Sequence, residues 1–379
     1  MKKVLMTLFV CGVMIIGSWQ SGDAALLDGL LSGVEDSLGD RLAKKGEKLK
    51  VGNFYTSEKP NAHGPIGMMG DHTHDKGEFM FTYRYMNMDM DGNRDGTDNV
   101  SARDIVSPTG GGFNVTPTDM RMQMHMFSGM YGVNDTLTVM VMVPYIINSM
   151  NHLTRMGAKF KTESEGVGDV KLTSLWRLYA FEAPSIGAHR FHLNFGLSLP
   201  TGSFKKKDDT SLGRARLPYP MQLGSGTVDV LPGLTYGGEM GDAAWGFLAL
   251  GTIRIGRNTA GYSKGNAYQL NLFGSYAWTR WVSTSLRFNW SDWGNYDGRD
   301  TDIRPHPVIA PEDFISTADP NRRAGERLDL LPGINLLFPE IWGLENHIGV
   351  EGGVPIYQNL DGPQLETDWI FNVGWQVVY

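Results

Sequence analysis

The sequence predicts an all-β fold: a twelve-stranded antiparallel transmembrane β-barrel preceded by a short, partly helical N-terminal extension. Three observations lead to this fold class: an N-terminal export signal, repeated alternation of apolar and polar residues, and connections that alternate between long and short. The last segment, from Asp368 to Tyr379, places apolar side chains at every second position and ends on an aromatic residue. One face of such a strand could meet lipid and the other a polar lumen.

The N-terminal segment has the pattern of a secretory signal. Lys2 and Lys3 precede an apolar run from Val4 to Ile16, and small residues follow up to Ala24. The apolar run is shorter than the ~20 residues that a spanning helix needs, so we expect cleavage after Ala24 rather than a membrane anchor. The predicted domains are a signal peptide at 1–24, an N-terminal periplasmic extension or plug with a Met/His-rich segment at 25–77, and the transmembrane barrel at 78–379.

Composition limits the classes of partner. The chain carries a formal net charge of −7, which argues against nucleic acid, because phosphate binding requires clustered Lys and Arg. The only cysteine, Cys11, lies within the signal, so the exported chain is expected to have neither disulfides nor thiolate ligands. The terminal aromatic strand resembles that of outer-membrane proteins, whose last strand carries their assembly signal. This resemblance implies the barrel assembly machinery and outer-membrane lipid as partners.

Twelve segments with a period of two can serve as spanning strands. An even number of strands places the beginning and the end of the barrel wall on the same side of the membrane, as closure of a single chain requires. Connections between them alternate in length, and short turns are expected to face the periplasm. The segments are 78–89, 118–131, 136–145, 168–179, 190–199, 227–236, 245–255, 267–278, 281–290, 327–337, 347–354 and 368–379.

The alternation predicts an inner face with polar or charged residues in the lumen and an outer face with apolar residues toward lipid. On this rule Met120, Met122, Met124 and Met126 face lipid, because Arg121 and His125 alternate with them. The inner charges predict either a selective pore or a salt-bridge lattice that fills a narrow barrel. The predicted lumen-lining residues are Arg84, Met86, Met88, Arg121, His125, Met140, Met142, Arg177, His192, Asn194, Arg254 and Arg287.

A Met- and His-rich segment precedes the first predicted strand. It contains His63, Met68, Met69, His72 and His74 within a dozen residues. Thioethers and imidazoles bind soft and borderline metal ions, so these five residues are a candidate copper site. The alternative is structural, because methionine also fills irregular space in a plug.

A second candidate metal motif is Asp91-x-Asn93-x-Asp95-Gly96, which has the start of a calcium-binding loop. The twelfth position, where a bidentate acidic residue belongs, is Ala102, and the flanking segments are predicted strands rather than helices. The sequence therefore favours a solvated acidic loop over calcium binding.

Three Gly- and Pro-rich pieces carry a family resemblance: Gly166-Val167-Gly168-Asp169, the stretch from Leu197 to Gly202, and the stretch from Leu223 to Leu234. They resemble the outer-membrane barrel family described as transporters of the phenol meta-degradation pathway. The resemblance covers about 166–379 and implies a channel for aromatic compounds. The first half of the chain is similar instead to a Met- and His-rich subgroup of exported barrels with no assigned activity.

These observations lead to two functional expectations. The first is an outer-membrane channel or transporter for a small solute, including apolar or aromatic compounds. The second is a copper-binding or copper-transporting barrel that uses the Met/His-rich segment. An enzyme is not expected, because His192, Asn194 and Ser198 lie on one strand, where they are poorly placed to form a catalytic relay.

Overall fold

The computed structural model describes residues 59–211, 213–303, 310–341 and 344–379, with short stretches at 29, 32–33, 36–39, 42–43 and 50–51. The predicted signal peptide and most of the predicted N-terminal helix lie outside the described residues. No helix in the described part of the chain is long and apolar enough to cross a membrane.

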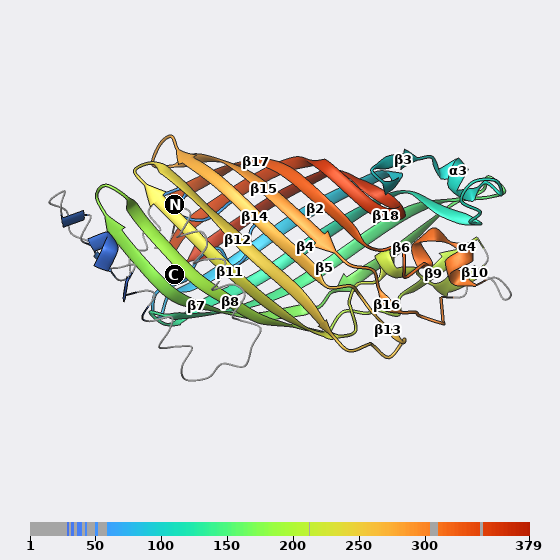
Figure 1. The fold of residues 1–379 in the computed structure, drawn as a ribbon, viewed down its shortest axis with the longest axis horizontal. Helices are drawn as coiled ribbons and strands as arrows, with labels where there is room; N and C mark the ends of the chain where they lie inside the picture. The colour runs from blue at the N-terminus through green and yellow to red at the C-terminus, as the bar shows by residue number, and fades with distance from the viewer. Residues whose placement is uncertain are drawn as a thin grey trace.

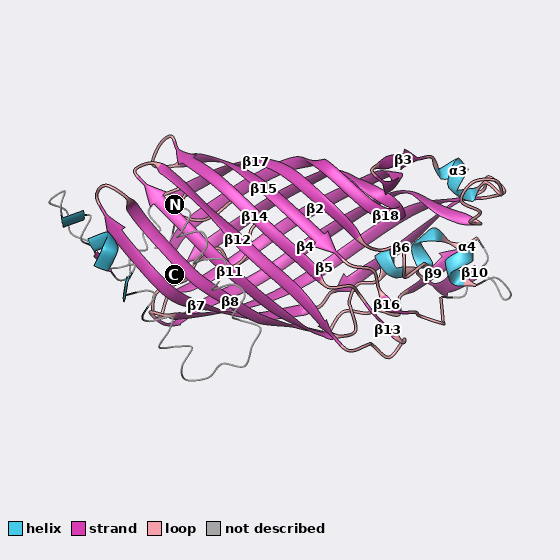
Figure 2. Ribbon diagram, viewed as in Figure 1, coloured by secondary structure: helices cyan, strands magenta, loops and turns pink. Residues whose placement is uncertain are grey.

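The described chain forms a closed antiparallel β-barrel (Figures 1 and 2). Eleven elements make up the wall, and pairing of β5 with β7 closes the ring. In order around the wall, these elements are β7 (Val170–Ala183), β8 (Gly187–Leu199), β11 (Val228–Met240), β12 (Ala243–Ile255), β14 (Ala267–Ala277), β15 (Val282–Trp293), β17 (Gly325–Ile341), β18 (Leu344–Val378), β2 (Phe79–Gly96), β4 (Val115–Asn134) and β5 (Leu137–Thr154).

The count of eleven labelled elements differs from the predicted twelve strands because the label β18 covers two passes of the wall. Its first part, up to Leu360, pairs antiparallel with β17, and its second part, from Leu360 to Val378, pairs antiparallel with β2. The predicted segments 347–354 and 368–379 both fall within it. Gln358 donates to the Thr367 carbonyl, Asn372 donates to Glu351 and Trp375 donates to Asn346, so these two segments run antiparallel beside each other and the chain reverses between them. The sequence predicted the closed antiparallel wall, but it did not predict that the connection between these two segments also has strand structure.

Several predicted long loops contain strand structure, among them the connections at 146–167 and 90–117. The connection predicted at 146–167 contains the second half of β5 and the whole of β6 (Lys159–Val167). These two strands pair with each other and extend the wall beyond the residues where β5 pairs with β7. The connection predicted at 90–117 begins with the last residues of β2. It continues through β3 (Asp98–Val100) and α3 (Ala102–Val106), and it ends in the first residues of β4.

The two ends of the barrel differ. At the long-loop end lie β3, α3, β9 (Lys207–Thr210), β10 (Gly213–Arg216), β13 (Tyr262–Ser263), β16 (Asp297–Gly298) and α4 (Pro311–Phe314), as Figure 1 shows. The 3-10 turns η2 (Tyr219–Met221) and η3 (Ser316–Ala318) pack together with several of these loops around a buried apolar cluster. We call these loops and turns together the cap. The opposite, short-turn end carries the C-terminus, and β1 (Lys50–Val51) pairs with β7.

The distribution of side chains is inverted relative to a soluble β-sandwich. Large apolar residues such as Val141, Phe195 and Trp375 are exposed on the outer face, whereas polar residues such as Thr138, Asn194 and Glu351 are buried on the inner face. A soluble sandwich would bury its apolar face between two sheets. An apolar outer belt around a polar interior is the pattern of a barrel that spans a membrane.

Candidate functional site

The inside of the barrel at the short-turn end is filled by residues 59–77, which we call the plug. Its contacts come from strands around the wall: Ser283 of β15 donates to the Pro60 carbonyl, and Arg84 of β2 donates to the Met68 carbonyl, at 3.0 and 2.6 Å. On another side, Arg177 of β7 donates to Thr73 Oγ1 at 2.9 Å. Residues 59–77 of the predicted N-terminal extension therefore lie inside the lumen.

The carbonyl of Gly70 is bound by three side chains of the wall. His192 Nε2 lies 3.0 Å from it, and Asn194 Nδ2 and Thr235 Oγ1 each donate to it at 3.2 Å. His192 and Asn194 were considered above as members of a catalytic set. In the structure these two residues hold the plug, together with Thr235 from the next strand.

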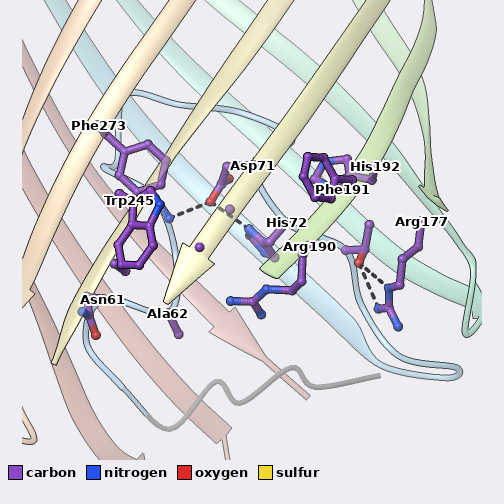
Figure 3. Close-up of a pocket in the computed structure, with 15 residues that line it drawn as sticks. Asn61, Ala62, Asp71, His72, Arg177, Arg190, Phe191, His192, Trp245 and Phe273 are labelled. Carbon is purple, nitrogen blue, oxygen red and sulfur yellow. Dashed lines mark hydrogen bonds and ion pairs between the residues drawn. The ribbon is translucent and has the colours of Figure 1, made fainter. Parts of the chain in front are cut away.

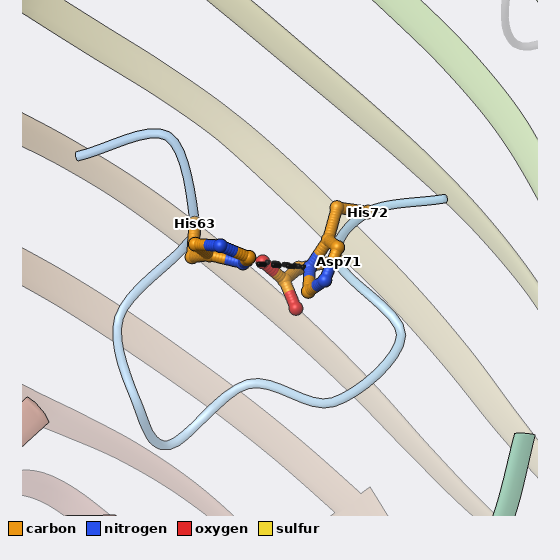
Figure 4. Close-up of side chains that lie close together, drawn as sticks. All are labelled: His63, Asp71 and His72. Atoms are coloured by element: carbon orange, nitrogen blue, oxygen red, sulfur yellow. Dashed lines mark hydrogen bonds and ion pairs between the residues drawn. The ribbon is translucent and has the colours of Figure 1, made fainter. Parts of the chain in front are cut away.

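Histidines from the plug and the wall form a cluster with one carboxylate. His63 Nδ1 lies 3.4 Å from His72 Nδ1, and Asp71 Oδ2 lies 3.1 Å from His72 Nδ1. Figure 4 shows how the chain between His63 and His72 loops out and returns, so that its two ends meet at these side chains. The backbone N–H of Gly64 donates to Asp71 Oδ2 at 2.7 Å, which fixes the returning end of the loop.

Two further histidines extend the cluster. The ring of His347, on the inner face of β18, lies 4.4 Å from the ring of His63 between centroids. The ring of His74 lies 4.9 Å from that of His72, and its Nδ1 lies 3.1 Å from Glu78 Oε2. Burial lowers the pKa of His74, and burial with the neighbouring histidines His72 and His347 lowers the pKa of His63 well below its usual value.

Asp71 supplies the negative charge of the cluster. Burial by itself raises its pKa, but the charge of His72 and hydrogen bonds from His72 and the Gly64 N–H outweigh burial, so the net pKa lies well below its usual range. The cluster therefore combines an ionised carboxylate with imidazoles that are shielded from water.

The sequence-predicted metal set is only partly brought together. His63, His72 and His74 are in the cluster, but Met69 packs against the methionines Met80, Met130 and Met140. Met68 is buried, and its carbonyl is bound by Arg84. Sequence reasoning missed Asp71, although it is adjacent to His72. It also missed His347, because nothing in the sequence indicates which strand faces the plug.

A small pocket lies between the plug and the wall (Figure 3). Its volume is about 40 Å³, which is enough for water or an ion but not for an organic solute. The labelled residues of Figure 3 show Asp71 and His72 on the plug side, with Arg190 and His192 on the wall side. The lining residues are Asn61, Ala62, Gly64, Asp71, His72, Thr73, Arg177, Arg190, Phe191, His192, Gly237, Gly238, Ala244, Trp245 and Phe273.

The predicted calcium motif does not form a loop. Asp91, Asn93 and Asp95 lie in β2, where the chain is extended. The Asn93 amide donates to the Pro117 carbonyl at 2.8 Å, and the Asp95 carboxylate accepts from the Gly362 N–H at 3.2 Å. The three oxygen-bearing side chains therefore do not converge on one point.

Two predicted lumen residues face outward. Arg121 of β4 has a side chain that is 60% exposed and pairs with Asp89, and His125 contacts the Tyr83 hydroxyl at 2.9 Å on the same outer face. The assignment failed because β2 and β4 are 18 and 20 residues long, whereas about 9–11 residues suffice to cross a bilayer. Beyond the apolar belt a polar residue can face water on the outside.

The methionines that alternate with Arg121 and His125 therefore point inward, opposite to the prediction. Register pairs Met80 with Met130 and Met130 with Met140, and it likewise pairs Met90 with Met120 and Met120 with Met150. Two rows of three methionines thus cross strands β2, β4 and β5. Met86 and Met88 lie on the same face of β2, opposite Met124 and Met122 of β4.

The remaining predicted lumen residues lie on the inner face. Arg287 forms a buried ion pair with Glu351, and Arg254 forms one with Asp229. Met140 and Met142 are buried on β5. The inner charges in these contacts are paired between strands that are adjacent in the wall or separated by one strand, an arrangement of the kind expected for a salt-bridge lattice.

Two larger cavities lie inside the barrel between the plug and the cap. The first, of about 250 Å³, is bordered by Met69 and Gly70 of the plug and by wall residues that include Met140, Leu250 and Trp293. The second, of about 150 Å³, is lined by Met88, Met90, Met120, Met150, Pro220, Trp293, Thr317, Arg323, Arg327, Gln358, Leu360, Gln364, Leu365 and Thr367. Trp293 borders both, so the two cavities are neighbours.

Comparison with known proteins identifies the fold. Neither a protein-family model nor a curated protein matches the chain. Among solved structures, the chain is similar to the COG4313 outer membrane channel from Pseudomonas putida F1, with a TM-score of 0.53 and 12% identity over 82% of this chain and 98% of that one. At lower TM-scores follow a Pseudomonas aeruginosa FadL homologue (0.39, 12% identity, 87% and 98% coverage) and the transport unit of the autotransporter AIDA-I from Escherichia coli (0.42, 9% identity, 82% and 93%). The first similarity shows that the chain has the fold of an outer-membrane channel.

Proposed function

We propose that this protein is an outer-membrane channel that admits a small apolar or aromatic solute and is closed at its inner end by the plug. The short-turn end faces the periplasm in this proposal, as in other barrels with short periplasmic turns. Residues 1–24 are removed on export, and the cap lies outside the cell. The apolar outer belt and the outer-membrane channel fold support the location.

The observation that carries the choice of solute is the 250 Å³ cavity above the plug. An apolar protein cavity of roughly 150 Å³ holds benzene, so this one has room for a substituted aromatic ring. Its lining mixes Met140, Leu250 and Trp293 with Lys171 and Asn194. Apolar side chains with a few polar groups are the usual lining of a small-molecule site.

The position of the plug makes the channel a gated one. The cavity is bordered on one side by Met69 and Gly70, and the Gly70 carbonyl is held by three wall side chains. A solute that leaves toward the periplasm must therefore displace this part of the plug. In this proposal, the solute enters through the cap and stays bound in the cavity until the plug moves.

The test is uptake into proteoliposomes that contain the full-length protein, comparing phenol-sized aromatic solutes with sugars of similar mass. Leu250→Trp fills the cavity, and Leu272→Trp, on the exposed outer face of the adjacent strand β14, is the matched control. We expect Leu250→Trp to reduce aromatic uptake at least several-fold and the control to leave it unchanged. Equal uptake by both variants, or a preference for sugars, would remove the apolar-solute proposal.

The methionine rows favour a second candidate, the passage of a soft metal ion such as Cu⁺. Cross-strand pairing brings Met90, Met120 and Met150 side by side above Met80, Met130 and Met140. Thioethers select soft ions, and a series of weak sites permits exchange between them. Ag⁺ flux into the same liposomes tests this candidate. Replacing Met120 and Met130 by Leu should abolish the flux and leave aromatic uptake intact.

A further inference from the structure

The histidine cluster has no role in the proposed passage of a solute, and its geometry points to a metal site. We propose that His63, Asp71, His72 and His347 bind one divalent transition-metal ion of borderline softness, with Zn²⁺ as the representative. The ion would fasten the plug to strand β18 of the wall.

The distances between donor atoms fit a tetrahedral ion. With metal–ligand bonds of about 2.0–2.1 Å, neighbouring donors of a tetrahedral site lie about 3.3–3.4 Å apart. The pair His63 Nδ1 and His72 Nδ1 is separated by 3.4 Å, and Asp71 Oδ2 is 3.1 Å from His72 Nδ1. One donor atom from each of the three residues lies within 4.8 Å of the others. Only small side-chain movements are needed for all three to reach one ion.

The fourth ligand comes from the wall. His347 is 4% exposed, and its ring contacts that of His63 at a centroid distance of 4.4 Å. Its Nε2 atom is buried and has no hydrogen-bond partner among the described residues. A buried polar nitrogen without a partner is unfavourable, and metal coordination is one way to satisfy it. Because His347 is on β18, the site joins two parts of the chain that are far apart in sequence.

The donor set determines the class of ion. Three imidazoles and one carboxylate suit Zn²⁺ and neighbouring divalent ions, whereas Cu⁺ prefers thioethers and thiolates and Ca²⁺ prefers oxygen alone. The thioether of Met69 lies instead with Met80 and Met130. We leave His74 outside the ligand set because its Nδ1 is directed to Glu78 at 3.1 Å.

The positions of the ligands explain how a bound ion would fasten the plug to the wall. Asp71 and His72 directly follow Gly70, whose carbonyl is held by β8 and β11, whereas His347 is on the separate element β18. A bound ion would therefore link the plug to a part of the wall that those hydrogen bonds do not reach. The idea that this link also holds the channel shut rests on the proposed function. Ion binding and the fastening of the plug do not depend on the proposed function.

The test uses the folded full-length protein, purified in detergent without a histidine tag and stripped of metal with a chelator. Zn²⁺ binding is measured by calorimetry, and Co²⁺ is added as an optical probe of tetrahedral geometry. Hydrogen exchange of residues 59–77 is followed with and without Zn²⁺. His72→Asn and His347→Leu remove ligands, and His189→Leu, a histidine of wall strand β8 outside the cluster, is the control.

We expect the wild type and the control to bind one Zn²⁺ per chain, to give a tetrahedral Co²⁺ spectrum, and to show slower exchange in the plug when Zn²⁺ is present. Each ligand variant should bind at least about 100-fold more weakly, since even outer-shell partners contribute about 10- to 100-fold. The proposal is overturned if the folded wild type binds neither ion. It is equally overturned if His347→Leu binds as tightly as the wild type, or if Zn²⁺ leaves plug exchange unchanged. None of these readouts involves transport, so a failed uptake experiment would leave them standing.

Discussion

Arg287 of β15 and Glu351 of β18 form a bidentate ion pair in the barrel lumen, with Nε to Oε2 at 2.9 Å and Nη2 to Oε1 at 2.5 Å. Both side chains are almost fully buried, and Asn271 and Asn372 complete their hydrogen bonds. The two residues are on strands separated by β17, so the pair links two strands of the wall over the inner face of β17. Gly67 of the plug lies directly against both side chains.

The first prediction concerns the stability of this pair. Glu351→Gln leaves Arg287 as a buried charge without its counter-ion, and breaking a buried pair in this way destabilises proteins by about 3–5 kcal/mol. We expect a loss of this size in the free energy of unfolding, measured by urea titration in lipid vesicles. Asp297→Asn, which breaks the fully exposed pair of Arg257 and Asp297 in the loops, is the control and should leave stability unchanged.

The second prediction concerns which face of β4 lines the lumen. Met120 is 2% exposed, whereas the side chain of its neighbour Arg121 is 60% exposed. In a background with Cys11 replaced by Ser, Arg121→Cys should react rapidly with a bulky, membrane-impermeant maleimide on intact cells. Met120→Cys should react slowly if at all. The reverse order of reactivity would restore the orientation that the sequence pattern suggested.

The error on β4 shows what alternation can and cannot predict. In β8 and β15 the polar face and the lumen face coincide, and residues such as His192 and Arg287 are buried on that face. In β2 and β4 the strands continue past the apolar belt, and Arg121 meets water outside the barrel. Methionine can face either lipid or the lumen, so the pattern gives the two-residue period of the strand but not which of its faces points into the lumen.

The candidate site shows a similar limit. His63, His72 and His74 are close in sequence, which made them recognisable as a cluster. Along the sequence, most of the barrel strands lie between His72 and His347. Only the pairing of β18 with its neighbouring strands brings the two histidines close together in space. Met69 was grouped with the histidines because it is nearby in sequence, yet its side chain packs in a different part of the lumen.

The third prediction concerns the cap. Arg216 Nη1 binds Asp300 Oδ2 at 2.7 Å, and its Nη2 binds Asp302 Oδ2 at 2.9 Å, but Asp300 is buried whereas Asp302 is 70% exposed. Asp300→Asn should loosen the cap, because it removes the buried counter-charge of a buried arginine. We expect faster proteolysis of the loops at this end and a larger conductance in planar bilayers.

Asp302→Asn serves as the control for the cap, because it removes the exposed carboxylate from the same arginine. Exposed ion pairs contribute little, so it should leave proteolysis and conductance close to those of the wild type. If both aspartate variants behave alike, the buried pair does not hold the cap in place.

The central claim is that residues 59–77 lie inside the barrel, and an engineered disulfide tests it most directly. A Cβ atom built on Gly349 of β18 would lie 2.6 Å from Ile66 Cβ, so a small shift brings the pair to the ~3.8 Å that a disulfide requires. With Cys11 replaced by Ser, the pair Ile66→Cys and Gly349→Cys should cross-link almost completely on oxidation. Ile66→Cys with Ile348→Cys, whose side chain points outward, should not cross-link. Absence of the first cross-link in the folded barrel, or equal formation of both, would contradict the plugged barrel described here.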